Sequence, residues 1–412
     1  MRDLDHYYSL YDQAVITNMV EQEFEISSEA EPMTYRQNRN NKRVLFFDQI
    51  KALMVALVIV VHVLFALLFG WYGVRIPSEE SSDPLFQVAA GWCMYFCQTF
   101  FMYMLFLLSG YFVPRSVHKK GIVDYLKVRI RRIGIPFLIG LLLINNASWL
   151  LGRLSPASPL AKLAWSNIPF NRIGVLWFLV VLFLFDLLYC TWVALRGDHF
   201  SVDTSAPTPQ LRSWLTSAFV LAILEVVLAT RTDLWAALRR SSLDGLGLQG
   251  MHIFTYAFMF FLGCKASFHR WLERLNTHLV VRWFRFSVAL ALCLLAIALV
   301  LTFNGSMSSE SGKFSLLGTF LSPFIGWGMI AYLLLWFQRN ENQCGHWLAT
   351  AGVDSFGAYV IHPLVLVIVL TTIGFIGFNH WLIALAASVL GIMISFGISH
   401  QLRRIPSVAR II

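Results

Sequence analysis

Charge is scarce in this chain: Asp, Glu, Lys and Arg together make up only 13% of its 412 residues. Hydrophobic residues make up 57% of the sequence, and the mean hydropathy is +0.64. A soluble chain of this length would form two or three domains and would carry far more charge. The composition therefore excludes an ordinary soluble protein and predicts an all-α polytopic membrane protein.

Several short motifs are also missing. The sequence has no glycine-rich phosphate loop, no HExxH and no GxSxG, which removes the usual signatures of NTP hydrolysis, zinc proteolysis and serine hydrolysis. Its six cysteines show no paired CxxC spacing, so we interpret them as small core residues and expect no bound metal. The net charge of +9 does not indicate a nucleic-acid partner, because membrane proteins gather Lys and Arg on their cytosolic loops.

The first 45 residues contain no apolar core followed by a small-residue cleavage site, so we expect no signal peptide to be removed. Their polar composition predicts a disordered cytosolic tail over residues 1–45. The transmembrane domain is expected over residues 46–406, and residues 407–412 are expected to form a cytosolic C-terminus.

Ten apolar stretches are candidate membrane-spanning helices, since a span needs about 20 residues. They are residues 46–69, 90–113, 133–152, 174–195, 213–230, 253–268, 283–303, 314–337, 355–378 and 380–400. With the N-terminus inside, 23 of the 32 Lys and Arg residues fall on the inner side and 8 on the outer side, while Lys51 lies within a span. Because basic residues favour cytosolic loops, this asymmetry predicts a bundle of about ten helices with both termini in the cytosol.

Three ionisable residues, Asp48, Lys51 and His62, interrupt the first span, FFDQIKALMVALVIVVHVL. Eleven helical steps separate Lys51 from His62, about 20° beyond three full turns, so both lie on one face about 16 Å apart along the axis. Asp48 precedes Lys51 by three residues on the same face, where an ion pair would lower the cost of both charges. The alternative is that Asp48 and Lys51 reach the inner interface while His62 is a hydrogen-bonded core residue. For His62 we predict a functional role, because ionisable groups deep in a membrane usually belong to functional sites.

A second basic feature lies in the expected cytosolic loop RSVHKKGIVDYLKVRIRRIGIPF. Arg129 and Arg132 are three residues apart, which places both on one side of the incoming helix. Such a fork suits phosphate oxygens. The alternative is that these residues are positive-inside charges that bind anionic lipid.

Single polar residues in other spans are weaker candidates. Ser109 precedes Gly110 at the end of the second span, where small residues serve either close helix packing or substrate access. Trp177 is expected near the outer start of the fourth span, and Asp186 in its middle. Like Glu225 in the fifth span, Asp186 needs a partner that the sequence does not identify.

His362 directly precedes Pro363 in the segment SFGAYVIHPLVL. A proline kink frees a backbone carbonyl, and a bond from the His362 ring to that carbonyl is a sufficient structural account of this histidine. We keep it as a candidate supporting residue of the site.

Together these residues resemble the acyltransferase 3 family of integral membrane O-acyltransferases. A basic residue, ten residues and a His match Lys51 and His62; the preceding acidic residue matches Asp48; and the family's basic pair matches Arg129 and Arg132. The segments FLLSGYF, VLWFL and AYVIHPLVL also resemble family segments in the expected order. The resemblance runs from about residue 46 to 406 and is greatest for the glucan succinyltransferase branch.

Two departures from the family pattern stand out. Val175 lies directly before LWFL, where many relatives have His, so any role of that His is lost or moved. Lys51 replaces the commoner Arg, which keeps the charge but gives up bidentate phosphate geometry.

The resemblance implies an acyltransferase of the cytoplasmic (inner) membrane that moves a short acyl group, acetyl or succinyl, from cytosolic acyl-CoA to a hydroxyl of an extracytoplasmic glycan. Lys51, Arg129 and Arg132 would then bind the donor. His62, with Asp48, would be catalytic, either as a general base or through an acyl-histidine intermediate. No cofactor is expected, and accessory periplasmic or glycan-synthesis proteins are candidate partners.

Two other classes of function stay open at this point. In a proton-coupled transporter or flippase, Asp48, Lys51, His62, Asp186 and Glu225 would line a pathway across the membrane. A signalling or scaffold protein would not need the polar face at all. Only the acyltransferase would consume an acyl-CoA thioester.

Overall fold

Long apolar runs fold as helices in lipid because the bilayer offers the backbone no hydrogen-bond partners. The structure is a computed structural model, and it describes residues 45–75, 83–155, 158–163, 172–198, 200–231, 252–376 and 379–411. Within these ranges every regular element is a helix and no strand is present, which confirms the predicted all-α fold. Residues 1–44 of the predicted tail lie outside the described residues, and Leu45 is the first residue of a helix.

The helices follow one another as α3 (Leu45–Phe69), α4 (Pro84–Gln98), α5 (Phe101–Lys120), α6 (Ile122–Arg129), η2 (Ile130–Gly134), α7 (Ile135–Ile139), η3 (Gly140–Asn145), α8 (Asn146–Gly152), η5 (Gly174–Leu176), α9 (Trp177–Arg196), α10 (Leu211–Thr230), α12 (Ile253–His269), η7 (Trp271–Glu273), α13 (Thr277–Phe303), α14 (Met307–Arg339), α15 (Gly345–Gly374), α16 (His380–Arg403) and α17 (Pro406–Ala409).

Nine helical units in the described ranges are long and apolar enough to cross a membrane. Pro84–Lys120 is one of them, 37 residues long, and it is broken between α4 and α5 at Thr99 and Phe100. The sixth predicted span corresponds to α12, which has 17 residues. The count therefore agrees with a bundle of about ten helices.

The cytosolic loop predicted at residues 115–132 is instead helical apart from Gly121. α5 continues to Lys120, Gly121 has a φ of 75°, and α6 begins at the next residue. Hydropathy marks only the apolar part of a helix, so charged helical ends extend beyond a predicted span. From Ile122 to Gly152 the chain forms one helical unit that contains two π-helical stretches, η2 and η3. Such stretches often lie at functional sites.

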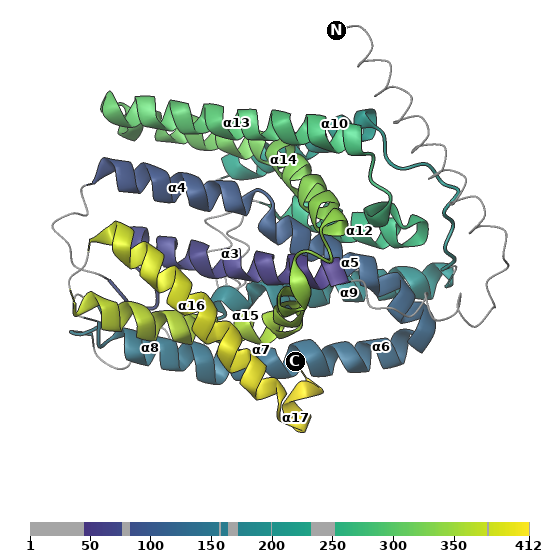
Figure 1. Cartoon of the computed structure of the whole chain (residues 1–412), viewed down its shortest axis with the longest axis horizontal. Coiled ribbons are helices and arrows are strands. Elements are labelled where there is room, and N and C mark those ends of the chain that lie inside the picture. Colours follow the sequence, from purple (N-terminus) through teal and green to yellow (C-terminus); the bar gives the residue numbers. More distant parts are fainter. Residues whose placement is uncertain are drawn as a thin grey trace, which may run out of the picture. The chain divides into compact units, whose positions relative to one another are not determined.

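α3 lies within the bundle and contacts α4, α5, α14, α15 and α16 (Figure 1). Its Ile50, Met54 and Ile59 are completely buried. At Gly352 of α15 the two backbones meet: an added Cβ would lie only 1.9 Å from the carbonyl oxygen of Asp48. The polar face of α3 therefore packs against protein, as its charges require.

The helices alternate in direction, so their ends gather on two sides. α3, α13 and α15 end, and α4, α14 and α16 begin, at the left of Figure 1. We call this the distal end of the bundle and the opposite one, where α3 begins, the proximal end.

Candidate active site

The ion pair predicted in the first turns of α3 is confirmed. Lys51 Nζ lies 3.1 Å from Asp48 Oδ1, which satisfies part of a carboxylate that is almost completely buried. The Lys51 side chain is 32% exposed, and its Nζ also lies 5.2 Å from the ring centroid of Phe112. The pair therefore offers a partly accessible positive charge at the proximal end of the bundle.

His62 lies near the other end of α3 and is half-buried. Its Nδ1 lies 2.7 Å from the carbonyl oxygen of Val58, one helical turn earlier. A carbonyl oxygen can only accept a hydrogen bond, so Nδ1 carries the hydrogen. In the neutral ring the lone pair is then on Nε2, the atom that can take a proton from a substrate.

His362 of α15 is the closest histidine neighbour that the structure gives to His62. The two ring centroids lie 5.0 Å apart. His362 Nδ1 bonds at 2.5 Å to the carbonyl oxygen of Tyr359, the residue that Pro363 leaves without its helical N–H partner. This confirms the bond expected from the His-Pro sequence. The Nε2 atom of His362 is buried and has no hydrogen-bond partner within the described part of the chain.

Trp71 lies against the rings of His62 and His362, which we call the imidazole pair. Its ring centroid lies 4.8 Å from that of His62 and 6.0 Å from that of His362. A tight turn after α3 brings it there: Trp71 and Val74 pair across the turn, and Tyr72 has a left-handed φ of 47°. The pattern of the sequence does not reveal this turn, so Trp71 is a site residue that sequence reasoning missed.

A buried amide fixes the same turn to the third span. Tyr72 donates a hydrogen bond of 2.9 Å to Asn145 Oδ1, and Asn145 Nδ2 donates to the carbonyl oxygens of Arg172 and Ile173. Asn145 is the last residue of the π-helical stretch η3 and is completely buried. The Asn145 side chain therefore joins the turn after α3, the third span and the segment before α9.

Val175, at the position where many relatives have His, takes part through its backbone. Its carbonyl oxygen accepts a hydrogen bond from the Tyr359 hydroxyl. Tyr359 is buried and its ring lies 5.8 Å from that of His362. A valine can still hold the segment before α9 against α15, because the contact with Tyr359 uses no side-chain atom of residue 175.

Asp186 has the partner that the sequence did not identify. Its Oδ2 lies 2.7 Å from Arg129 Nε, and its Oδ1 accepts hydrogen bonds from Arg129 Nη2 and from the Tyr125 hydroxyl. Arg129 therefore turns into the bundle, whereas Arg132, beyond the start of η2, is exposed. A donor-binding role for either residue stays a prediction.

The remaining candidates lie in other parts of the bundle. Ser109 is half-buried, and its neighbour Gly110 brings α5 against α12, with an added Cβ only 2.0 Å from the Phe260 carbonyl oxygen. This confirms close helix packing at that segment. Trp177 begins α9, and its ring lies 5.5 Å from that of Tyr256.

The site thus consists of two neighbouring imidazoles against a tryptophan ring. No group of three or more His, Cys, Asp or Glu side chains that could hold a metal ion occurs among the residues described. The arrangement is suited to removing a proton from a hydroxyl group.

Comparisons with known proteins identify the family of the chain. A family model described as "Acyltransferase domain" matches residues 44–400. Glucans biosynthesis protein C of Escherichia coli strain K12 is 27% identical over 161 residues, which are 38% of this chain and 40% of the relative. The same protein of E. coli O6:K15:H31 is 28% identical over 166 residues, with the same coverage. The chain thus matches less than half the length of these curated relatives. The family match over most of the chain shows that it belongs to the acyltransferase domain family.

Proposed function

We propose that this acyltransferase moves a short acyl group, acetyl or succinyl, from cytosolic acyl-CoA to a hydroxyl of an extracytoplasmic carbohydrate. The observation that carries the proposal is the ring of His62, whose Nδ1 bonds to Val58 and leaves Nε2 free beside His362. A general base needs such a nitrogen, which carries a lone pair and is not bonded to another group. The relatives named for glucan biosynthesis support a carbohydrate acceptor.

In this mechanism His62 Nε2 takes the proton of the acceptor hydroxyl as its oxygen attacks the thioester carbonyl carbon. The new C–O bond forms and the C–S bond breaks, so that coenzyme A leaves as a thiolate and receives the proton from the imidazolium. His362 is a positioning residue whose unused Nε2 accepts a hydrogen bond from a neighbouring hydroxyl group of the same sugar. The Trp71 ring covers the pair and limits the access of water.

The donor would approach from the proximal end, which we place in the cytosol on the basis of the loop charges. The partly accessible Lys51 and the exposed Arg132 offer positive charge to its phosphates. His62 lies about 16 Å further along α3, a distance that the pantetheine arm spans. Arg129 is paired with Asp186, and this pair holds α6 against α9.

The experiment uses the purified full chain in lipid nanodiscs with labelled acetyl-CoA or succinyl-CoA and a glucan acceptor. We expect His62→Ala to lower transfer by about 10²–10⁴-fold, the usual contribution of a general base. His278→Ala, an exposed histidine at the start of α13, is the matched control and should keep wild-type turnover. Wild-type turnover in His62→Ala would refute the assignment. Movement of a substrate without consumption of thioester would indicate a transporter instead.

A further inference from the structure

A chamber with a volume of about 770 Å³ lies on another side of α3. This is within the range of small-molecule sites, roughly 300–1,000 Å³. Its apolar walls come from the distal ends of α3, α4, α13 and α14 and include Leu67, Phe86, Trp92 and Phe314. Leu67 follows His62 by five residues, about 140° around the helix. The chamber and the imidazole pair therefore occupy different faces of α3.

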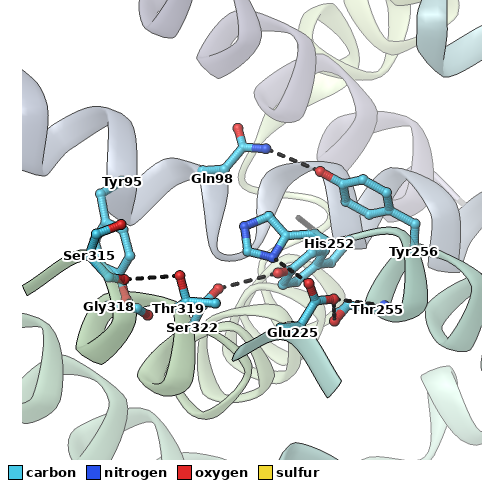
Figure 2. A network of polar contacts seen from close by, with 11 residues as sticks. Tyr95, Gln98, Glu225, His252, Thr255, Tyr256, Ser315, Gly318, Thr319 and Ser322 are labelled. Carbon is cyan, nitrogen blue, oxygen red and sulfur yellow. Dashed lines mark hydrogen bonds and ion pairs between the residues drawn. The ribbon is translucent and has the colours of Figure 1, made fainter. Parts of the chain in front are cut away.

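Several polar residues line this chamber, and Figure 2 shows the contacts among them. The Tyr95 hydroxyl donates a hydrogen bond of 2.7 Å to the Gly318 carbonyl oxygen, and Thr319 Oγ1 donates one of 2.9 Å to the Ser315 carbonyl oxygen. These α14 residues lie about 12–18 Å along the helix from its distal start. His252, which also lines the chamber, lies beside them.

A buried carboxylate orients His252. Glu225 of α10 is completely buried, and its Oε1 accepts hydrogen bonds from the backbone N–H and the hydroxyl of Thr255. Its Oε2 lies 3.4 Å from His252 Nδ1, and neither atom has a hydrogen-bond partner in the described part of the chain. The rings of Tyr103 and Tyr256 hold the imidazole from the sides, at 5.7 and 6.2 Å. With Nδ1 turned to Glu225, the Nε2 edge of the ring remains for the chamber.

The residues that line the chamber indicate which class of ligand it can bind. The described residues that line the chamber include no Lys, Arg, Asp or Glu, so an anion would find no cation there and would approach the carboxylate of Glu225. A hydroxyl group both donates and accepts hydrogen bonds, which matches an imidazole nitrogen and the neighbouring hydroxyl groups. The aromatic walls suit the C–H faces of a sugar ring.

We propose that this chamber is a binding subsite for a neutral carbohydrate, with a sugar hydroxyl bonded to His252 and a sugar ring packed on Trp92. The proposal rests on the proposed function, because the acceptor glycan is the occupant: one of its sugars reacts at His62 while another is held in this chamber. His252 is a positioning residue in this scheme.

Gly91 of α4 allows the chamber to be blocked without disturbing the fold. It lines the chamber, and an added Cβ would meet no atom within 4 Å. Gly91→Leu therefore fills the chamber with a side chain that a helix accepts readily. Gly397→Leu on α16 is the matched control, since a Cβ there also meets nothing within 4 Å and Gly397 lies outside the chamber lining.

The test is isothermal titration of a neutral β-glucan pentasaccharide into each variant in nanodiscs, without acyl-CoA. We expect wild type and Gly397→Leu to bind alike and Gly91→Leu to bind at least about tenfold more weakly. His252→Ala should weaken binding by about 5–10-fold, the loss of one hydrogen bond, while His278→Ala should not. An oligosaccharide of the same length made of uronic acids should not bind.

Three results would overturn the subsite: no binding to wild type, equal binding to wild type and Gly91→Leu, or equal binding of the anionic oligosaccharide. Because no donor is present, a failure of acyl transfer leaves this measurement unchanged. The two proposals therefore fail separately: wild type that transfers acyl groups but binds no pentasaccharide would refute only the subsite, and wild type that binds the pentasaccharide but transfers nothing would refute only the proposed function. In the transfer assay Gly91→Leu should raise the KM for the acceptor.

Discussion

The imidazole of His362 replaces a backbone hydrogen bond that the chain cannot make. Pro363 has no N–H, so the Tyr359 carbonyl would lack its partner one turn later in α15. The 2.5 Å bond from His362 Nδ1 supplies that partner and fixes the ring with Nε2 free beside His62. A local defect of the helix thus orients a residue of the site.

Restoring the backbone donor should make this bond redundant. In the wild-type background we expect His362→Ala to lower the free energy of unfolding by about 1–3 kcal/mol, because a buried carbonyl loses its partner. In the Pro363→Ala background the new N–H donates to Tyr359, and the same change should cost about 1 kcal/mol less. Thermal unfolding of the four proteins gives the double-mutant cycle. Equal costs in both backgrounds would show that the ring is held by something else.

How well a site residue could be predicted depended on where its partner lies. The Lys51 ion pair and the His362 bond join residues three apart on one helix, so helical geometry alone predicted them. Asp186 and Arg129 are 57 residues apart, and only the packing of α6 on α9 brings them together. Trp71 reaches His62 through a turn with a left-handed residue, which no hydrophobic period marks.

Among the elements, α3 and α15 form the contact on which the site depends. His62 is on one and His362 on the other, and Gly352 lets the two backbones touch at Asp48 near their proximal ends. Small residues allow such contacts between membrane helices.

Gly352→Val tests that contact. Its side chain would start 1.9 Å from the Asp48 carbonyl oxygen, so α15 must move away from α3, and overpacking of this kind costs about 1–3 kcal/mol. We expect a lower unfolding temperature together with lower acyl transfer, because the imidazole pair separates. The control is Gly397→Val, where a Cβ meets nothing within 4 Å. Wild-type stability in Gly352→Val would contradict the close approach.

The elements themselves were largely predictable, because an apolar run of sufficient length in lipid has no alternative to a helix. Their ends were not. Hydropathy placed residues 115–132 in a loop, whereas only Gly121 interrupts the helices there, and no pattern signalled the π-helical stretches η2 and η3.

At the scale of the whole molecule, function depends on which end of the bundle faces the cytosol. Lys51, proposed to bind the donor, and the chamber proposed to bind carbohydrate lie at opposite ends. Acyl-CoA is cytosolic, so the proposed reaction requires the proximal end inside. The distribution of 23 and 8 basic residues favours this orientation.

Cysteine labelling tests the orientation directly. In a background with the six native cysteines replaced, Ser309→Cys places an exposed thiol at the distal start of α14, and His278→Cys places one at the proximal start of α13. The excess of Lys and Arg resists translocation of the proximal loops, so an impermeant maleimide should label Ser309→Cys in cells with a permeable outer envelope and an intact inner membrane. His278→Cys should be labelled only after the inner membrane is opened. Labelling in the reverse order would place the donor charges on the side without acyl-CoA and would refute the direction of transfer proposed for His62.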